Sequence, residues 1–123
     1  MTDRPTLVYD DDCGFCTWCA RVAVRHCDVD ALGFSDLDEP LLARLPSDYE
    51  RGAHLLADGE TYSFGASIER TLARAHPALS ALFAGLRRVP GYAALRERLY
   101  RWGADRRAWW GRIVRSKSVY GPA

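Results

Sequence analysis

The chain has 123 residues, of which 48% are hydrophobic and 27% are charged, and its formal net charge is +1. This length suits a single domain with its own hydrophobic core, and the composition excludes a disordered or fibrous protein. No apolar run approaches the roughly 20 residues that a membrane-spanning helix needs, so we expect no membrane span.

A short strand and a longer helix are the first predicted elements. Residues 5–9 form a β-prone apolar run, and Asp10-Asp11-Asp12 forms a turn in which Asp12 is a good helix N-cap. Apolar or small residues at spacings of three and one then predict a helix over residues 14–26. These residues are Cys16, Cys19, Ala20, Ala23, Val24 and Cys27, and the opposite face would carry Thr17, Arg21 and Arg25.

The second predicted strand covers residues 31–36. Because a helical crossover joins it to the first strand, we expect the two strands to be parallel. A short helix is indicated over residues 41–45, where Pro46 would stop it.

A hairpin and a third helix complete this part of the chain. Residues 53–57 and 60–64 flank Asp58-Gly59, which is the preferred residue pair of a type I′ turn. A helix opens directly after the hairpin and ends before Pro77. The resulting order, β-α-β-α-β-β-α, is that of a minimal thioredoxin-like α/β core.

Beyond residue 77 the pattern is helical. A short apolar stretch over residues 79–86 is broken by Pro90-Gly91, and apolar and aromatic residues then recur at spacings of three and four as far as Ile113. We expect one long helix or two helices broken near Gly103. The single domain thus divides into a thioredoxin-like core (1–77), a C-terminal helical extension (78–115) and a frayed tail (116–123).

The extension is also strongly basic. Residues 86–123 carry nine Arg and one Lys against two acidic residues, whereas residues 1–85 carry seven Arg against 14 acidic residues. A basic segment can bind nucleic acid or anionic lipid. Here the basic residues alternate with Trp, Tyr and Leu at helical spacing, which favours packing on the acidic half or a solvated face. We therefore expect no nucleic-acid binding, and we name the Arg- and Trp-rich helices as the candidate surface for a protein partner.

The strongest chemical signal is Cys13-Gly-Phe-Cys16, between the first strand and the first helix. A CxxC pair at such a junction is typical of a dithiol that forms one disulfide and releases it again. The start of a helix stabilises a thiolate, although the three neighbouring aspartates oppose it. We predict that Cys13 attacks a substrate disulfide and that Cys16, on the buried stripe, resolves the mixed disulfide. Asp10, at the strand end, is the candidate base for Cys16.

Two other interpretations of the cysteines remain open. Cys13, Cys16, Cys19 and Cys27 also read as C-x2-C-x2-C-x7-C, which begins like an iron–sulfur run and would allow a zinc site. Cys19 and Cys27 are explained more simply as small buried fillers of the helix stripe, so we expect no metal and no cofactor. The chain could also be a non-catalytic interaction module on a thioredoxin-like scaffold.

Weaker signals lie elsewhere in the chain. The helix start at Ser63–Ser67 is also able to bind the carboxylate of a thiol ligand such as glutathione, through its backbone N–H groups. We assign structural roles to the histidines, with His26 and His76 at the ends of helices and His54 alternating with core positions on a strand.

The opening of the chain resembles that of the DCC family of thiol–disulfide oxidoreductases. That opening runs Tyr-Asp-Gly-Asp-Cys-x-x-Cys; the matching residues are Tyr9, Asp10, Asp12, Cys13 and Cys16, and Asp11 replaces the glycine. The similarity extends over most of the chain, to Asp58-Gly59, Gly65-Ala66, Val89-Pro90 and Tyr92. It implies a thioredoxin-like fold and thiol–disulfide exchange. One departure is that Gly52-Ala53-His54 stands where thioredoxin-like enzymes commonly place a cis-proline.

Together these features predict a small cytoplasmic enzyme. The first residues have neither the basic nor the hydrophobic region of a secretory signal, which favours a reducing cytoplasm. The predicted reaction exchanges a Cys13–Cys16 disulfide with a protein or a low-molecular-weight thiol.

Overall fold

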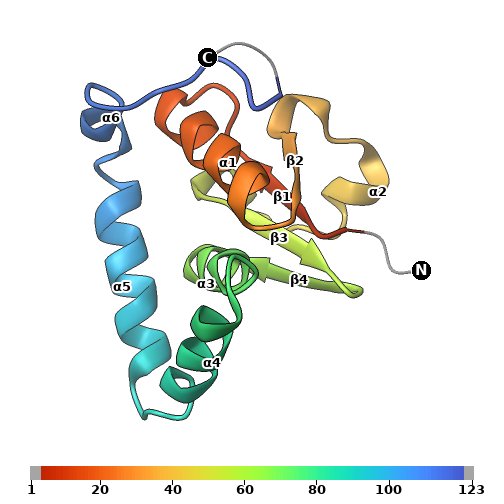
Figure 1. Ribbon diagram of the computed structural model, residues 1–123. Coiled ribbons are helices and arrows are strands. Elements are labelled where there is room, and N and C mark those ends of the chain that lie inside the picture. The colour runs from red at the N-terminus through yellow and green to blue at the C-terminus, as the bar shows by residue number, and fades with distance from the viewer. Residues whose placement is uncertain (1–3, 121–123) are drawn as a thin grey trace.

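The computed structural model describes residues 4–120 and is a mixed α/β structure with a four-stranded sheet (Figure 1). The strands are β1 (Thr6–Tyr9), β2 (Asp30–Gly33), β3 (His54–Ala57) and β4 (Glu60–Ser63), in the spatial order β2-β1-β3-β4. The helices are α1 (Gly14–His26), α2 (Glu39–Leu42), α3 (Gly65–Ala73), α4 (Pro77–Leu86), α5 (Tyr92–Ala104) and α6 (Arg107–Trp110), with 3-10 turns η1 (Phe34–Asp36) and η2 (Tyr49–Arg51). Within residues 4–120, no helix has the length and apolar character to cross a bilayer.

The sheet confirms the predicted thioredoxin-like arrangement of strands. β1 pairs in parallel with β2 and antiparallel with β3, so that Leu7 stands opposite both Ala31 and Leu55. β3 and β4 form the predicted hairpin. Asp58 and Gly59 both have positive φ angles, of 53° and 77°, as the type I′ turn requires.

The two faces of the sheet are covered differently. Leu7 and Leu55 point to one face, where they form the hydrophobic core with residues of α1 and of the chain end; its buried members are Leu7, Ala20, Ala23, Cys27, Val29, Leu55 and Val119. The other face carries the fully buried His54. Its ring donates from Nε2 to the carbonyl of Tyr49 and accepts at Nδ1 from Ser63, both at 2.8 Å. Burial lowers the pKa of His54, so the neutral ring is a structural link.

Several element boundaries differ from the prediction. Asp12 is not the N-cap of α1, because Cys13 holds that position. The second strand ends at Gly33 rather than at Asp36, and η1 follows it, because Asp11 accepts hydrogen bonds from the backbone N–H and the hydroxyl of Ser35.

The ends of two helices also differ. α2 begins two residues earlier than expected, because the Asp38 side chain accepts from the N–H of Leu41 and caps it. His76 does not end α3 but caps α4, where its Nδ1 accepts from the N–H of Ala78 at 3.0 Å.

The C-terminal extension consists of α4, α5 and α6, and the predicted break lies directly after Ala104. It is tied to the core by Glu69 of α3, whose side chain is only 2% exposed. Glu69 accepts from Arg87 at 2.6 Å, from the hydroxyl of Tyr92 at 2.7 Å and from Arg96 at 3.2 Å. Burial alone would raise the pKa of Glu69, but these three donors lower it below its ordinary value.

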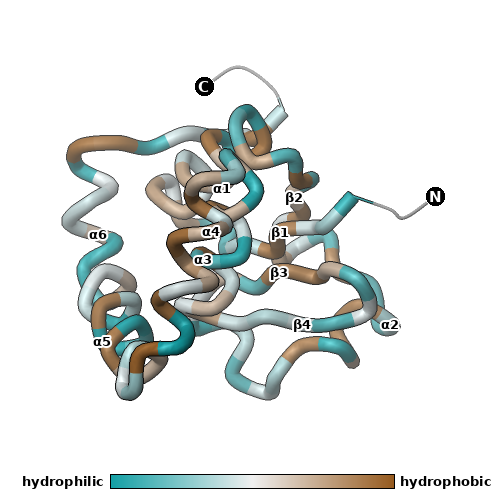
Figure 2. The backbone as a smooth tube through the Cα atoms, turned by 60° about the horizontal axis from the view of Figure 1, so that its bottom comes forward, coloured by the Kyte–Doolittle hydropathy of each residue, from teal (hydrophilic) through white to brown (hydrophobic). Residues whose placement is uncertain are grey.

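The apolar stripe of the extension is largely exposed rather than buried in a core. Figure 2 shows hydrophobic stretches in the central strands and again along α4 and α5. The exposed members of the predicted stripe are Leu95, Leu99, Trp102, Trp109 and Ile113. The extension therefore exposes large hydrophobic side chains, whereas the sheet buries its hydrophobic side chains in the core.

The end of the chain turns back over α1 (Figure 1), so the prediction of a frayed tail is wrong for residues 116–120. The N–H of Ser116 donates to the carbonyl of Gly14 at 3.0 Å, and the hydroxyl of Tyr120 accepts from the N–H of Ala31 at 2.9 Å. Val119 is 8% exposed and belongs to the core. The rest of the predicted tail, residues 121–123, lies outside the described residues.

The returning segment also explains why one face of α1 was misjudged. Thr17 was expected on the face opposite the apolar stripe, but it is buried, with 2% of its surface exposed. Gly14 and Arg21, one turn before and one turn after it, both bind the segment at residues 116 and 118. Thr17 therefore lies beneath the chain end, and its hydroxyl donates to the carbonyl of Cys13 at 2.9 Å.

Candidate active site

The sulfur of Cys13 lies at the N-terminus of α1. Its backbone is extended, with φ −106° and ψ 116°, and its Sγ accepts a hydrogen bond from the N–H of Cys16 at 3.2 Å. A serine or aspartate oxygen usually fills this capping position. A thiolate there would gain both this hydrogen bond and the positive end of the helix dipole.

Cys16 lies one turn further along α1, and both cysteines are partly buried. Its Sγ is 3.8 Å from Nη1 of Arg107 in α6. Burial and the neighbouring Cys13 raise the pKa of Cys16 to about 12, although Arg107 opposes this rise. At neutral pH the inner sulfur is therefore a protonated thiol with a cation beside it. All four cysteines are free thiols.

Arg107 joins Cys16 to the third predicted site residue. The same Nη1 lies 3.4 Å from Oδ2 of Asp10, whose Oδ1 accepts from the N–H of Asp12 at 3.0 Å. Burial opposes the charge of Arg107, but its contacts with Cys16 and Asp10 outweigh this effect and raise the pKa of the guanidinium. The guanidinium of Arg107 thus lies between the carboxylate of Asp10 and the sulfur of Cys16 and contacts both.

Arg107 was not singled out in the sequence. It follows Cys16 by 91 residues, so no local spacing relates the two. The only available signal was the density of arginine in the extension, which did not distinguish Arg107 from its neighbours.

An apolar cavity of about 280 Å³ lies behind Cys16, between α1, the sheet and α5. Leu7, Phe15, Cys19 and Tyr100 contribute to its wall. Burial raises the pKa of Cys19 to about 11, so this third thiol is also protonated at neutral pH. Cys27 is buried in the core.

The structure does not gather the four cysteines of the described residues into one cluster. Among residues 4–120, no group of three or more His, Cys, Asp or Glu side chains is arranged to hold a metal ion.

The first backbone donor of α3 already has a partner within the chain. The N–H of Gly65, which opens α3, donates to Oε1 of Glu97 at 3.0 Å. Gly65 permits this approach because a Cβ there would lie 2.6 Å from the other carboxylate oxygen. The helix start, for which the sequence left glutathione-carboxylate binding open as a second role, is therefore occupied by the carboxylate of Glu97.

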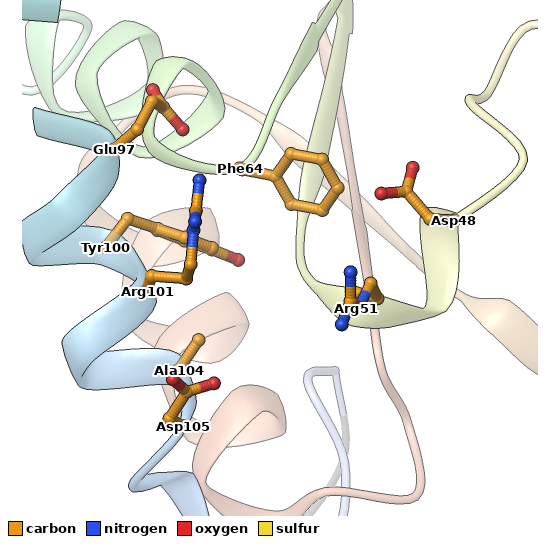
Figure 3. Close-up of a pocket in the computed structure, with 8 residues that line it drawn as sticks. All are labelled: Asp48, Arg51, Phe64, Glu97, Tyr100, Arg101, Ala104 and Asp105. Atoms are coloured by element: carbon orange, nitrogen blue, oxygen red, sulfur yellow. The ribbon is translucent and has the colours of Figure 1, made fainter. Parts of the chain in front are cut away.

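In the loop before β3, the backbone N–H of Ala53 also has a partner from α5. The N–H of Ala53 donates to the hydroxyl of Tyr100 at 2.8 Å, and residues 4–120 contain no cis peptide bond. Tyr100 also lines a second hollow, of about 340 Å³, between η2 and α5. Figure 3 shows charged side chains of both signs around this hollow, including Asp48, Arg51 and Arg101. None of its lining residues is a cysteine, whereas Cys16 and Cys19 line the apolar cavity on the other side of Tyr100.

Comparison with protein families gives one match. The model of the DCC1-like thiol-disulfide oxidoreductase family matches residues 7–113, from β1 to just beyond α6. The match includes both residues of the CxxC pair and the arginine of α6 beside them. Comparison with curated proteins and with solved structures gives no match.

Proposed function

Because the chain belongs to the DCC1-like thiol-disulfide oxidoreductase family, we propose that it is an enzyme that exchanges a Cys13–Cys16 disulfide with a protein or a low-molecular-weight thiol. The hydrogen bond from the N–H of Cys16 to Sγ of Cys13 is the observation that carries this proposal. It supplies an anion-stabilising donor to the outer sulfur of the pair.

In the reducing direction the reaction has two steps. The Cys13 thiolate attacks one sulfur of the substrate disulfide, the substrate S–S bond breaks, and a thiolate leaves as the mixed disulfide forms. Cys16 then attacks Sγ of Cys13, the mixed disulfide breaks, and the second substrate thiolate leaves. The protein dithiol is oxidised to a disulfide by two electrons, and the substrate is reduced to two thiols.

The second step needs the proton of Cys16 to leave. Its raised pKa, about 12, keeps Cys16 from competing for the substrate in the first step. Arg107, 3.8 Å away, stabilises the thiolate as it forms. We propose that Asp10 takes part as the base that accepts the proton, and the ion pair with Arg107 keeps its carboxylate next to the site.

The test is a trapping experiment on reduced protein mixed with a disulfide. We expect Cys13→Ser to lose exchange by at least about a thousandfold, as for loss of a covalent nucleophile. We expect Cys16→Ser to accumulate a mixed disulfide on Cys13, visible as a mass increase of one substrate half. Cys19→Ala, on the same helix, is the control and should exchange like the wild type.

Two results would contradict the proposal. One is unchanged exchange in Cys13→Ser. The other is a trapped adduct on Cys19 or Cys27 in place of Cys13.

We also propose that the extension binds a protein partner, as a second candidate function that does not require chemistry. Its support is the exposed apolar stripe, in which Leu95 is 55% and Ile113 is 64% exposed. A photo-crosslinking residue at position 113 should capture one discrete partner in cells, and the same residue at Arg44, on the α2 side, should not. If the chain is solely an interaction module, Cys13→Ser leaves both the capture and the cellular phenotype unchanged.

We propose the cytoplasm as the compartment of this activity. The reducing direction of the proposed reaction needs Cys13 and Cys16 as thiols, which is the state that a reducing compartment maintains. Fractionation of cells, with thiol trapping before lysis, tests this: the protein should be found in the cytoplasm with its cysteines largely reduced.

A further inference from the structure

A hollow of about 430 Å³ opens beside Cys13 and is separate from the apolar cavity behind Cys16. Its charged lining consists of Asp12 and three arginines, which are Arg107, Arg112 and Arg115. The arginines come from α6 and from the segment that follows it, so the extension supplies the cations at the outer sulfur. A volume of this size suits a small molecule.

A backbone hydrogen bond holds Arg115 close to the first turn of α1, where the CxxC thiols lie. The N–H of Ser116 donates to the carbonyl of Gly14, which fixes the segment on the first turn of α1. Gly14 carries no side chain, and a Cβ placed there would lie 2.9 Å from Cβ of Arg115. The glycine within the CxxC pair therefore makes room for an arginine that lies 101 positions later in the chain.

The positive charge of the arginines in this hollow is only partly balanced by acidic residues of the chain. Arg107 is paired with Asp10. Among residues 4–120, Arg112 and Arg115 have neither an ion pair nor a side-chain hydrogen bond, and both are exposed. Asp12, which is also exposed, is the single acid in the lining. Two guanidinium groups are thus available to a molecule that reaches Cys13.

We propose that Arg112 and Arg115 select a low-molecular-weight disulfide that carries a carboxylate on the half that becomes attached to Cys13. This inference rests on the proposed exchange function and adds the substrate class. Cys13 attacks the sulfur of that half, the other half leaves as a thiolate, and the arginines hold the retained carboxylate. Guanidinium groups suit this task because they bind carboxylates through paired N–H donors.

The first experiment does not depend on disulfide chemistry. Iodoacetate and iodoacetamide alkylate the same thiolate and differ in charge, so the ratio of their rates at Cys13 reports the local field and cancels changes in thiolate population. We expect Arg112→Gln/Arg115→Gln to lower the iodoacetate-to-iodoacetamide ratio about threefold or more, the size expected for two nearby solvated charges. The rates are read by mass spectrometry of the peptide that contains Cys13.

Two matched variants control this measurement. Arg88→Gln/Arg98→Gln removes the same charge from exposed arginines that do not line the hollow and should leave the ratio unchanged. Arg112→Lys/Arg115→Lys keeps the charge and should keep most of the ratio. Raising the salt concentration to about 0.5 M should bring the wild-type ratio toward that of the glutamine variant. An equal ratio in wild type and glutamine variant overturns the proposal.

The second experiment tests the substrate class directly. Reduced wild-type protein is mixed with 3,3′-dithiodipropionate, bis(2-hydroxyethyl) disulfide or cystamine, which are anionic, neutral and cationic. Each rate is divided by the rate of the same disulfide with 2-mercaptoethanol. We expect the corrected rates to fall in that order by about threefold or more per step, and the differences to disappear in Arg112→Gln/Arg115→Gln.

The outcomes separate the two proposals. Equal corrected rates for the three disulfides overturn the anionic substrate and leave the exchange function standing. Reaction with none of them overturns the low-molecular-weight substrate class, and the exchange function then depends on whether Cys13 reacts with a protein disulfide. A preference for cystamine overturns the substrate class and would assign the dominant field to Asp12 and its neighbours.

Discussion

The core of the molecule and its extension treat apolar and charged residues in opposite ways. The core buries its apolar residues between α1 and the sheet and carries both CxxC thiols. The extension leaves Leu99 and Trp102 more than half exposed, yet it directs Arg107 at the inner thiol. The comparison teaches that the backbone of α1 sets the position of the sulfurs, whereas distant residues set their electrostatic surroundings.

Polar and apolar contacts join the core to the residues that follow it, in addition to the contacts of Arg107 with Asp10 and Cys16. Glu69 holds Arg87 and Arg96, Glu97 accepts from the start of α3, and Tyr100 accepts from the N–H of Ala53. Val119, in the chain end beyond the extension, adds an apolar contact because it enters the core. Each junction can be removed by one substitution, and the losses should differ in size.

The largest effect is expected for Glu69→Ala. The substitution leaves Arg87 and Arg96, whose side chains are 30% and 21% exposed, without their shared carboxylate. We expect the free energy of unfolding to fall by about 3 kcal/mol, at the low end for a broken buried pair because the arginines keep some hydration. Urea unfolding measures it, and Glu60→Ala, at an exposed residue of β4, is the control.

The same carboxylate predicts an acid dependence. The three donors lower the pKa of Glu69, so its contribution to stability is complete above its ordinary value of 4.5 and is lost as the pH falls through the lowered value. The difference in stability between wild type and Glu69→Ala should therefore narrow below about pH 4. A difference that is constant with pH would mean that Glu69 is not ionised in the folded protein.

The next effect concerns the apolar junction. Val119→Ala should reduce the free energy of unfolding by about 2 kcal/mol, as expected for removing two methyl-sized groups from a packed core. Ile113→Ala, at a residue that is 64% exposed, should change it by less than about 0.5 kcal/mol. Equal losses in the two variants would show that the chain end does not pack on α1.

How much of this arrangement the sequence predicts depends on the distance between partners along the chain. The spacings of three and four residues between Cys16, Cys19 and Ala23 predict α1, and Asp58-Gly59 predicts the β3–β4 hairpin. Both signals are local, because the residues that carry them are close together in the chain. Both are confirmed. The catalytic roles of Cys13, Cys16 and Asp10 remain predictions.

The long-range contacts had no such signal. Val119 is a single apolar residue in a polar stretch, so no periodicity marks it as core, and the segment was read as frayed. A ligand carboxylate was considered as a partner of the α3 start, but Glu97 fills that place from a position 32 residues later in the chain. The sequence of a helix start predicts that a carboxylate can bind there, but only the tertiary structure shows which residue supplies that carboxylate.

We expect Arg107→Gln to slow the second step of the exchange reaction about tenfold. Loss of the cation should raise the pKa of Cys16 further above about 12 and slow the release of the second substrate thiol, by about 1.4 kcal/mol in its barrier. The first step at Cys13 should change less. Stopped-flow detection of the two thiols separates the steps.

The neighbouring Arg106 provides a matched control for this prediction. It stacks on Trp102 and donates to its carbonyl, and its contacts do not include either CxxC thiol. Arg106→Gln should therefore leave both steps within about twofold of wild type. If the two glutamine variants slow the second step equally, the contribution of Arg107 is a general charge effect of the extension rather than a contact with Cys16.

The smallest effect is expected for Tyr100→Phe, which keeps the ring between the two hollows and removes its hydroxyl. The N–H of Ala53 then loses its acceptor, which should cost about 1 kcal/mol of unfolding free energy and increase the hydrogen exchange of that amide. Tyr62→Phe, which keeps its contact with Arg70 through the ring, should be neutral. Unchanged exchange at Ala53 would mean that water replaces the hydroxyl, and the extension would then be held at this edge by ring packing alone.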